Sequence, residues 1–269
     1  MTTATKPTLG VGMIGYAFMG RAHSQAWRNA HSFFDPPAVP RLAAIAGRDE
    51  GAAKETAERF GWETVETDWR RLLERDDVDI IDICTPGDTH AEIAIAALEA
   101  GKHVLCEKPL ANTVAEAEAM AAAAEAARGR GVAAMVGFTY RRVPAVAYAR
   151  QLVAAGRIGR VLHVRGQYLQ DWLLDPEAPL SWRLQKERAG SGALGDIGAH
   201  IVDLAQHVTG EVLQGVSGLT ETFVHRRPLA SPAAYGIEVS PPTGEVTVDD
   251  AAVFISRLSG GALATFEAT

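Results

Sequence analysis

The sequence predicts an α/β protein, and three features of the chain support this fold class. Short apolar segments alternate with helix-like segments up to about residue 137, a pattern typical of a parallel sheet. Farther along, apolar and polar residues alternate within single segments, as in antiparallel strands with one solvated face. A glycine-bearing turn over residues 15–20 joins the first apolar segment to the first helical one. We therefore expect a doubly wound α/β domain over residues 1–137 and an α+β domain with an open, largely antiparallel sheet over residues 138–269.

Strands and helices of the first domain can be assigned in chain order. The expected strands are residues 11–14, 42–46, 78–84, 104–106 and 132–138, and the expected helices run through Trp27 and over residues 52–60, 91–100 and 113–129. Gly61 and Gly101 follow two of these helices, where a left-handed residue commonly ends a helix. Thr113 and Glu116 have the spacing of a capping box, which predicts the start of the alanine-rich helix.

The second domain has a different pattern. We expect helices over residues 144–155 and 193–208, strands over residues 160–170, 213–224, 251–258 and 262–269, and a proline-bearing loop over residues 226–242. In the first of these strands His163, Arg165 and Gln167 share one face, which predicts a half-exposed strand. The Ser-Gly-Gly sequence at residues 259–261 predicts a hairpin turn between the last two strands.

Composition excludes several classes of protein. With 269 residues, 47% of them hydrophobic, the chain is long enough for two domains and a sizeable core. A net charge of −7 argues against a nucleic-acid partner, because phosphate backbones require a basic surface. No apolar stretch reaches the roughly 18 residues that a membrane span needs. The two cysteines, Cys84 and Cys106, end apolar strands and read as reduced thiols, so we expect a cytoplasmic protein with no membrane partner.

The turn after the first strand carries the signature of a dinucleotide site. Its residues are Gly15, Tyr16, Ala17, Phe18, Met19 and Gly20. In a Rossmann domain such a turn places a pyrophosphate on the exposed N–H groups of the following helix. Ala17 stands where the fingerprint has its middle glycine, and one methyl group is small enough for this approach. We therefore expect NAD(P) to bind here, although glycine-rich turns also occur in proteins that bind no nucleotide.

A second motif lies about ninety residues farther on. Glu107, Lys108 and Pro109 follow the strand that ends at Cys106. Ligands of a doubly wound sheet collect at the carboxyl ends of its strands, so the Lys108 ammonium should face the same edge as the glycine turn. The alternative is a surface lysine in front of a helix-starting proline.

A third motif suggests acid–base chemistry. Asp196 and His200 are four residues apart in an expected helix, which puts both side chains on one face. A carboxylate beside an imidazole fixes its tautomer and raises its basicity, as proton removal from a hydroxyl requires. Alternatively, Asp196 complements the helix dipole and water satisfies His200. A metal site at this spacing has no obvious third or fourth ligand in the sequence, so no metal is expected.

Taken together, these motifs resemble the Gfo/Idh/MocA family of oxidoreductases. The carriers are Gly-Met-Ile-Gly-Tyr-Ala-Phe-Met-Gly-Arg-Ala-His at 12–23, Thr85-Pro86 with His90, Cys-Glu-Lys-Pro-Leu-Ala at 106–111 and Gly-Asp-Ile-Gly-Ala-His at 195–200. The stretches around Asp171-Trp172 and Trp182-Arg183 are similar to a subgroup that includes levoglucosan dehydrogenase and inositol dehydrogenase-like enzymes. Members of the family usually continue beyond the equivalent of Thr269, so we expect the second domain to be C-terminally truncated.

The resemblance implies a role for each motif residue. Lys108 would hydrogen-bond the reacting hydroxyl, His200 would be the leading general base and Asp196 would orient it; relatives differ in which of the three is the base. Cofactor contacts are implied for the glycine turn and for Arg48, Thr85, Pro86, His90, Glu107, Lys108, Trp182 and Arg183. Substrate contacts are implied for Tyr140, Arg141, Asp171, Trp172, Arg183, Asp196 and His200, because sugars are held by polar groups and an aromatic ring. Taken singly, each of these residues could equally be structural.

Cofactor choice depends on the end of the second strand. An acidic residue there accepts a hydrogen bond from the ribose 2′-hydroxyl of NAD, whereas an arginine can bind the 2′-phosphate of NADP. Here Gly47 occupies the expected acidic position and Arg48 follows it. We therefore lean slightly towards NADP, although Asp49 could still reach the ribose.

The predicted function is an NAD(P)-dependent dehydrogenase for a sugar, anhydrosugar or cyclic polyol. One alternative is NAD-dependent glycoside cleavage through a 3-keto intermediate, and another is a regulatory protein that binds the cofactor without turnover. We also expect a homodimer or homotetramer, because an open sheet with one helix-free face needs cover.

Overall fold

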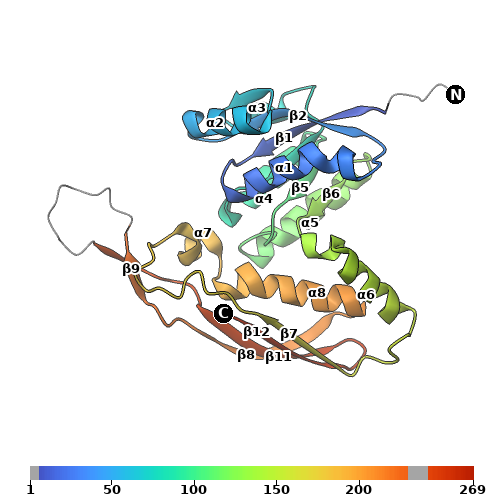
Figure 1. Ribbon diagram of the computed structural model, residues 1–269, viewed down its shortest axis with the longest axis vertical. Coiled ribbons are helices and arrows are strands. Elements are labelled where there is room, and N and C mark those ends of the chain that lie inside the picture. Colours follow the sequence, from blue (N-terminus) through green and yellow to red (C-terminus); the bar gives the residue numbers. More distant parts are fainter. Residues whose placement is uncertain (1–5, 230–241) are drawn as a thin grey trace. The chain divides into compact units, whose positions relative to one another are not determined.

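The computed structural model describes residues 6–229 and 242–269 of the chain (Figure 1). It divides into two compact units, residues 1–137 and residues 138–269. Each unit has its own hydrophobic core.

The first unit is built on a parallel sheet. Its strands are β1 (Thr8–Ile14), β2 (Val39–Ala46), β3 (Thr64–Glu66), β4 (Ile80–Ile83), β5 (His103–Cys106) and β6 (Ala134–Val136). They lie in the order β3-β2-β1-β4-β5-β6, and every pairing is parallel. This is the order of a Rossmann domain, so the predicted α/β fold class is confirmed. The chain reverses its direction of travel across the sheet between β1 and β4, where such domains bind their ligands.

Helices cover both faces of this sheet. They are α1 (Phe18–Phe33), α2 (Glu50–Phe60), α3 (Arg70–Leu73), α4 (His90–Glu99) and α5 (Val114–Arg128), with a short 3₁₀ turn η1 (Gly87–Thr89) before α4. Residues of α1 and α2 pack with Val11 and Met13 of β1 on one side. Residues of α3, α4 and α5 pack with Ile81 and Ile83 of β4 on the other. The near-continuous apolar strands of the sequence are therefore buried on both faces, as parallel strands are.

Local signals in the sequence set several helix ends. Thr113 and Glu116 form both hydrogen bonds of the predicted capping box at the start of α5. Gly61 ends α2 in the left-handed conformation, and Gly101 follows α4 with φ of 79°. The sequence predicts neither β3 nor α3, because three or four residues are too few to show a hydrophobic pattern.

The second unit contains a four-stranded mixed sheet with helices on one side. Its elements are η2 (Thr139–Arg142), α6 (Pro144–Ala154), β7 (His163–Tyr168), η3 (Trp182–Leu184), α7 (Lys186–Ala189), η4 (Leu194–Gly198), α8 (Ala199–Thr209), β8 (Leu213–Glu221), β9 (Arg226–Pro228), β10 (Thr243–Glu245), β11 (Ala251–Leu258) and β12 (Leu263–Ala268). The main sheet has the order β7-β12-β11-β8. Two of its three pairings are antiparallel and β12–β7 is parallel, so the predicted largely antiparallel sheet is confirmed.

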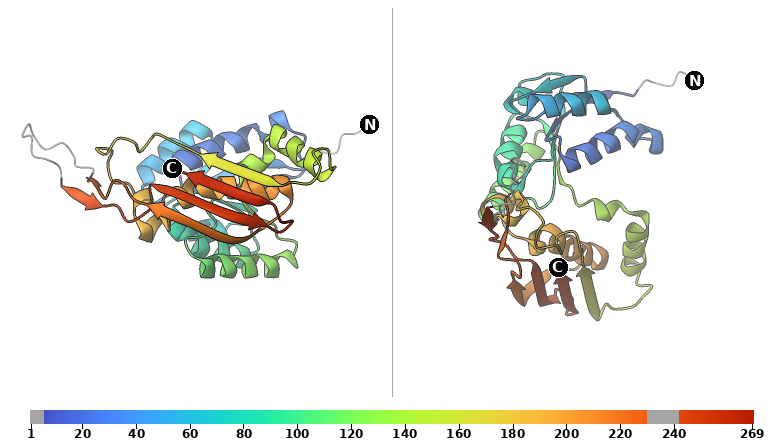
Figure 2. Two further views of the ribbon diagram at one scale, coloured as in Figure 1. Left: turned by 90° about the horizontal axis from the view of Figure 1, so that it is seen from below. Right: turned by 60° about the vertical axis from the view of Figure 1, so that its left-hand side comes forward.

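One face of this sheet carries the core of the unit. Phe254 and Phe266 stack at 4.9 Å between ring centroids and pack against Ile201 and Ala205 of α8. The other face is open, and the left-hand view of Figure 2 shows the four strands in front with the helices of the unit behind them. The predicted alternation along β7 is observed, with His163, Arg165 and Gln167 exposed.

Two predictions for this unit need correction. The expected helix over residues 193–208 begins as a π-helical turn, η4, and becomes α-helical only at Ala199. The expected loop over residues 226–242 contains strand β9, which pairs with β10; its residues 230–241 lie outside the described part of the chain. Pro228 is compatible with a strand because a two-stranded ribbon leaves one edge of each strand unpaired.

Candidate active site

The glycine turn has the geometry of a dinucleotide site. Gly15 has φ of 105°, and a Cβ at Gly20 would lie 2.1 Å from the Gly15 carbonyl oxygen, so strand and helix meet too closely for any side chain. Helix α1 begins after Ala17 without a side-chain cap and has no acidic residue in its first turn. Its first N–H groups can therefore receive an anion, and these residues fit a dinucleotide pyrophosphate.

The end of β4 lies next to this turn in the sheet. Thr85 and Pro86 follow β4, and Gly15 follows the adjacent strand β1. A Cβ at Gly15 would lie 2.8 Å from the Cys84 carbonyl oxygen, which shows how close the two strand ends are. The structure thus brings the glycine turn and Thr85-Pro86 together at the point where the strand order reverses.

His90 joins two loops at this edge. It is 1% exposed, with Nε2 at 2.8 Å from the Thr85 carbonyl oxygen and Nδ1 at 2.9 Å from the Pro109 carbonyl oxygen. Both ring nitrogens are therefore engaged with the backbone. In this structure His90 shapes the loops after β4 and β5, and its ring presents no open nitrogen to a cofactor.

Tyr16 explains the glycine at the end of β2. A Cβ added to Gly47 would lie 2.1 Å from Cε1 of the Tyr16 ring, so the ring occupies the space of any side chain there. Asp49, the other candidate for the ribose, accepts a hydrogen bond from the Ala52 N–H and caps α2. Arg48 is exposed beside them. Arg48, unlike Asp49, does not cap α2.

Lys108 follows a buried carboxylate. Glu107 is 5% exposed, and its Oε2 accepts a hydrogen bond from the backbone N–H of Lys108 at 3.0 Å. Its Oε1 lies 3.0 Å from Nε2 of His23, whose Nδ1 lies 3.0 Å from both oxygens of Asp82. Glu107 was expected to contact the cofactor, but its carboxylate is engaged inside the unit.

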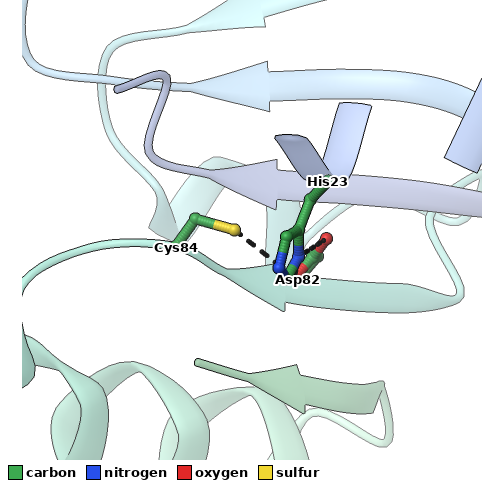
Figure 3. A group of neighbouring side chains, drawn as sticks. All are labelled: His23, Asp82 and Cys84. Atoms are coloured by element: carbon green, nitrogen blue, oxygen red, sulfur yellow. Dashed lines mark hydrogen bonds and ion pairs between the residues drawn. The ribbon is translucent and has the colours of Figure 1, made fainter. Parts of the chain in front are cut away.

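His23 and Asp82 received no role from the sequence, although the signal was present. Asp82 is an acidic residue inside an apolar strand, and a buried carboxylate requires a partner. Figure 3 shows His23, Asp82 and Cys84, whose potential ligand atoms all lie within 4.8 Å of one another. Trp27 Nε1 donates to Asp82 at 2.6 Å and the Cys84 thiol donates to it at 3.6 Å. Donors thus surround the Asp82 carboxylate, which is the arrangement of a hydrogen-bond network.

Burial and charge determine the protonation states in this network. Burial alone would lower the pKa of His23, but its hydrogen bonds to Asp82 and Glu107 and their negative charges raise it to about 10. Burial raises the pKa of Cys84, and the nearby Asp82 and Glu107 carboxylates raise it further. These shifts favour a charged His23 ring between the two carboxylates and a neutral Cys84 thiol.

In the second unit, aromatic rings surround His200. Its ring centroid lies 4.6 Å from that of Tyr140, 6.0 Å from that of Tyr168 and 6.2 Å from that of Phe138. The Tyr140 and Tyr168 hydroxyls are hydrogen-bonded at 2.8 Å. This bond, burial and the charge of Asp196 raise the pKa of Tyr168 to about 12, so its hydroxyl stays protonated.

The segment that carries Asp196 is fixed by Asp249. The two carboxylate oxygens of Asp249 accept hydrogen bonds from the N–H groups of Gly192 and Leu194 at 2.8 and 2.7 Å. A Cβ at Gly192 would lie 1.9 Å from the Asp249 carbonyl oxygen, so this contact requires glycine. Asp196 lies in the π turn η4, whereas His200 lies in the first turn of α8. The shared face of Asp196 and His200 stays a prediction.

The remaining expected substrate residues differ in their surroundings. Arg141 forms a two-armed ion pair with the buried carboxylate of Asp203 on α8. Arg183 lies over the Trp182 ring at 4.5 Å. Trp172 is half exposed and donates to Gln170, which donates to the Tyr168 hydroxyl at 3.3 Å; Asp171 is exposed. Tyr168 and, through it, Gln170 therefore join the group around His200, although the sequence predicts no functional role for either.

Comparison with known proteins identifies the family. Residues 9–138 match the Gfo/Idh/MocA oxidoreductase family with an NAD-binding Rossmann fold, and residues 146–269 match the Gfo/Idh/MocA C-terminal domain. The chain belongs to the Gfo/Idh/MocA family of oxidoreductases, which confirms the resemblance found in its motifs.

Similar proteins narrow the class. Levoglucosan dehydrogenase from Pseudarthrobacter phenanthrenivorans is 47% identical over 266 residues, which are 97% of this chain and 67% of that protein. An oxidoreductase domain protein from Kribbella flavida is 66% identical with a TM-score of 0.92 over 98% of this chain and 67% of that one. A structure of levoglucosan dehydrogenase in complex with NADH and levoglucosan is 46% identical with a TM-score of 0.89, over 97% of this chain and 67% of that one. The expected class, a nicotinamide-dependent sugar or polyol dehydrogenase, is thereby confirmed.

Two further facts bound this identification. The chain spans about two thirds of the length of these relatives. Among the helices that the structure describes, none combines the length and apolar character that crossing a membrane demands.

Proposed function

We propose that this protein is an NAD(P)-dependent dehydrogenase that oxidises a hydroxyl group of an anhydrosugar such as levoglucosan, or of a related sugar or cyclic polyol. The observation that carries the proposal is the 47% identity to levoglucosan dehydrogenase, which runs through both units of the chain. The uncapped start of α1 beside the glycine turn supports binding of the dinucleotide.

The proposed chemistry divides among three residues. When bound, the nicotinamide ring supplies the hydride acceptor. Lys108 of the first unit hydrogen-bonds the reacting hydroxyl and stabilises its developing negative charge. His200 of the second unit takes the hydroxyl proton, and Asp196 favours the protonated ring. Tyr140 and Tyr168 hold the His200 ring in place, and their hydroxyls are available to sugar oxygens.

Several of the remaining predicted contacts are also part of this proposal. Tyr140, Trp172 and Arg183 would contact the substrate, with Arg183 and Trp182 also facing the nicotinamide. For Arg141 and His90 we propose supporting roles instead, because their polar atoms are engaged with Asp203 and with backbone carbonyls.

For the cofactor, we propose a preference for NADP over NAD. The Tyr16 ring fills the space of an acidic side chain at Gly47, and Asp49 caps α2, which leaves the exposed Arg48 to meet a 2′-phosphate. The levoglucosan dehydrogenase structure contains NADH, so the opposite preference is the natural competing outcome.

The test is a set of turnover assays with paired variants. Near-ultraviolet absorbance of the reduced nicotinamide is followed with levoglucosan, myo-inositol and D-glucose, each with NAD⁺ and with NADP⁺. Lys108→Ala is compared with Lys54→Ala, which removes an exposed lysine paired with Glu50 on α2. We expect turnover with one pairing, its loss in Lys108→Ala and no change in Lys54→Ala. Equal activity in the two variants would contradict the role of Lys108, and product without net reduction of nicotinamide would indicate glycoside cleavage.

We also propose that two or four copies of the chain associate through the open face of the second sheet. Strand register places Leu219, Val253, Glu267 and Gln167 in one row across this face. The next rows are Ser217, Ile255, Thr265, Arg165 and then Gly215, Arg257, Leu263, His163. All of these residues except Arg165 line a hollow on this face. A face that mixes the exposed apolar side chains of Leu219, Val253, Ile255 and Leu263 with polar ones suits a second copy of itself.

A cytoplasmic location remains a proposal. Cys84 and Cys106 are both buried and free, and free buried thiols are typical of reducing compartments.

A further inference from the structure

The buried charges around His23 link three elements of the first unit. His23 lies on α1, Asp82 on β4 and Glu107 directly after β5. Their exposed fractions are 8%, 0% and 5%. Two carboxylates in such an interior are costly unless a cation lies between them, and the His23 ring lies 3.0 Å from each.

Hydrogen-bond chemistry favours the charged state of this ring. Both ring nitrogens of His23 face carboxylate oxygens, which only accept hydrogen bonds. A neutral imidazole has one N–H and would leave one nitrogen lone pair against a carboxylate. The charged ring donates to both, and its pKa, raised to about 10 by these partners against the effect of burial, agrees.

The network ends at the peptide of the proposed catalytic lysine. Glu107 uses Oε1 for His23 and Oε2 for the Lys108 N–H, so the carboxylate fixes the lysine backbone only while His23 fixes the carboxylate. Space around Glu107 is tight, since a Cβ at Gly137 would lie 3.0 Å from Oε1. On the other side, Asp82 is held by Trp27 of α1 and by the Cys84 thiol.

We propose that His23, as an imidazolium bridging Asp82 and Glu107, is a positioning residue. It holds the Lys108 backbone at a fixed position relative to α1, the helix that follows the glycine turn. The inference rests on the proposed function, because Lys108 has its catalytic role only there. It assigns no substrate contact to His23, whose ring is buried; it acts through Glu107.

The first arm of the test needs no turnover. Nitrogen-15 NMR of the histidine side chains measures the protonation of each ring nitrogen at about pH 8, above the ordinary histidine pKa. The His23 signals are assigned as those that disappear in His23→Gln. We expect both His23 nitrogens to carry protons there. A neutral His23 ring at that pH would overturn the proposal.

The second arm of the test measures hydrogen exchange at the Lys108 backbone amide. In His23→Gln and in Glu107→Gln, we expect hydrogen exchange of the Lys108 amide to be about tenfold faster, as loss of one charge-assisted hydrogen bond implies. Glu107→Gln keeps the shape, but an amide accepts at one atom and donates at the other, so it cannot serve both His23 and Lys108. Glu107→Gln also removes one of the two buried negative charges, so this variant can still be measured if His23→Gln does not fold. His31→Gln, on the exposed end of α1, is the matched control.

Kinetics complete the test. We expect kcat to fall about tenfold in both variants while KM for the dinucleotide stays within about twofold, because the lysine is displaced and the glycine turn is intact. A general loss of structure would change both constants. Unchanged exchange of the Lys108 amide in both variants overturns the proposal, and so does an unchanged kcat. Where the wild type turns over none of the sugars, the proposed function fails, and the amide exchange still decides whether His23 positions the Lys108 backbone.

Discussion

At the scale of single residues, Gly47 and Tyr16 make a test of cofactor recognition. Because a Cβ at residue 47 would lie 2.1 Å from the Tyr16 ring, Gly47→Asp forces the ring away from its place. We expect KM for both NAD⁺ and NADP⁺ to rise about tenfold, in keeping with overpacking costs of about 1 to 3 kcal/mol. Steady-state kinetics with the two dinucleotides measure this.

The same experiment has a control and a rescue. Gly51→Asp adds the same charge on the exposed first turn of α2, where a Cβ meets nothing closer than 3.4 Å, and should leave KM unchanged. Tyr16→Ala combined with Gly47→Asp should recover binding and favour NAD⁺. A single Gly47→Asp variant that simply prefers NAD⁺ would show that the Tyr16 ring is not an obstacle.

Features that depend on neighbours in the chain could be predicted from the sequence better than contacts between residues far apart in the chain. The glycine turn, the capping box and the buried thiols could be predicted because each depends on neighbours in the chain. His23 could not be given a role, because its partners Asp82 and Glu107 are 59 and 84 residues away and meet it only when β4 and β5 are paired. The same holds for Arg141 and Asp203, and for Tyr16 and Gly47.

At the scale of elements, the capping box of α5 gives a prediction for stability. Thr113→Ala removes the hydroxyl that accepts from the Glu116 N–H and should lower the free energy of unfolding by about 1 kcal/mol. Val114→Ala, one residue on and 74% exposed, should change it by less than about 0.5 kcal/mol. Urea unfolding of both variants measures the difference, and equal midpoints would show that the capping box contributes nothing to stability.

Helices and strands could be predicted where their hydrophobic pattern extends over enough residues. The strands and helices of the first unit follow such patterns, and so does the alternation of β7. The π turn η4 was not predictable, because a wider helical turn leaves the same apolar residues on much the same side. Its position at Asp196 therefore emerged only from the structure.

At the scale of the whole molecule, the buried charges make stability depend on pH. The folded-state pKa of His23, about 10, lies above its unfolded value of 6.5. Its contribution is therefore complete below about pH 6.5 and is lost as pH rises through about 10. We expect His23→Gln to be less stable than the wild type by about 3 to 5 kcal/mol at about pH 6, and this gap to shrink towards about pH 10. Thermal unfolding at several pH values measures it, and a gap that widens with pH would contradict the charged ring.

The open face of the second sheet gives a prediction for assembly. Ile255 is 59% exposed in the middle row of that face, and Ile255→Asp would place a charge at the centre of the proposed interface. We expect the variant to sediment as a monomer and the wild type as a dimer or tetramer. Ile158→Asp, at a residue 62% exposed outside this sheet, is the control. A monomeric wild type would overturn the proposed association.

The proposed function depends on hydride transfer from a sugar with Lys108 at the reacting hydroxyl. The most direct test is the initial rate of nicotinamide reduction by levoglucosan, measured with the wild type, Lys108→Ala and Lys54→Ala. We expect a measurable rate in the wild type and in Lys54→Ala. In Lys108→Ala we expect the rate to fall at least about a hundredfold, the scale of removing one stabilising donor from a reacting oxygen. A wild-type rate that Lys108→Ala retains would contradict it.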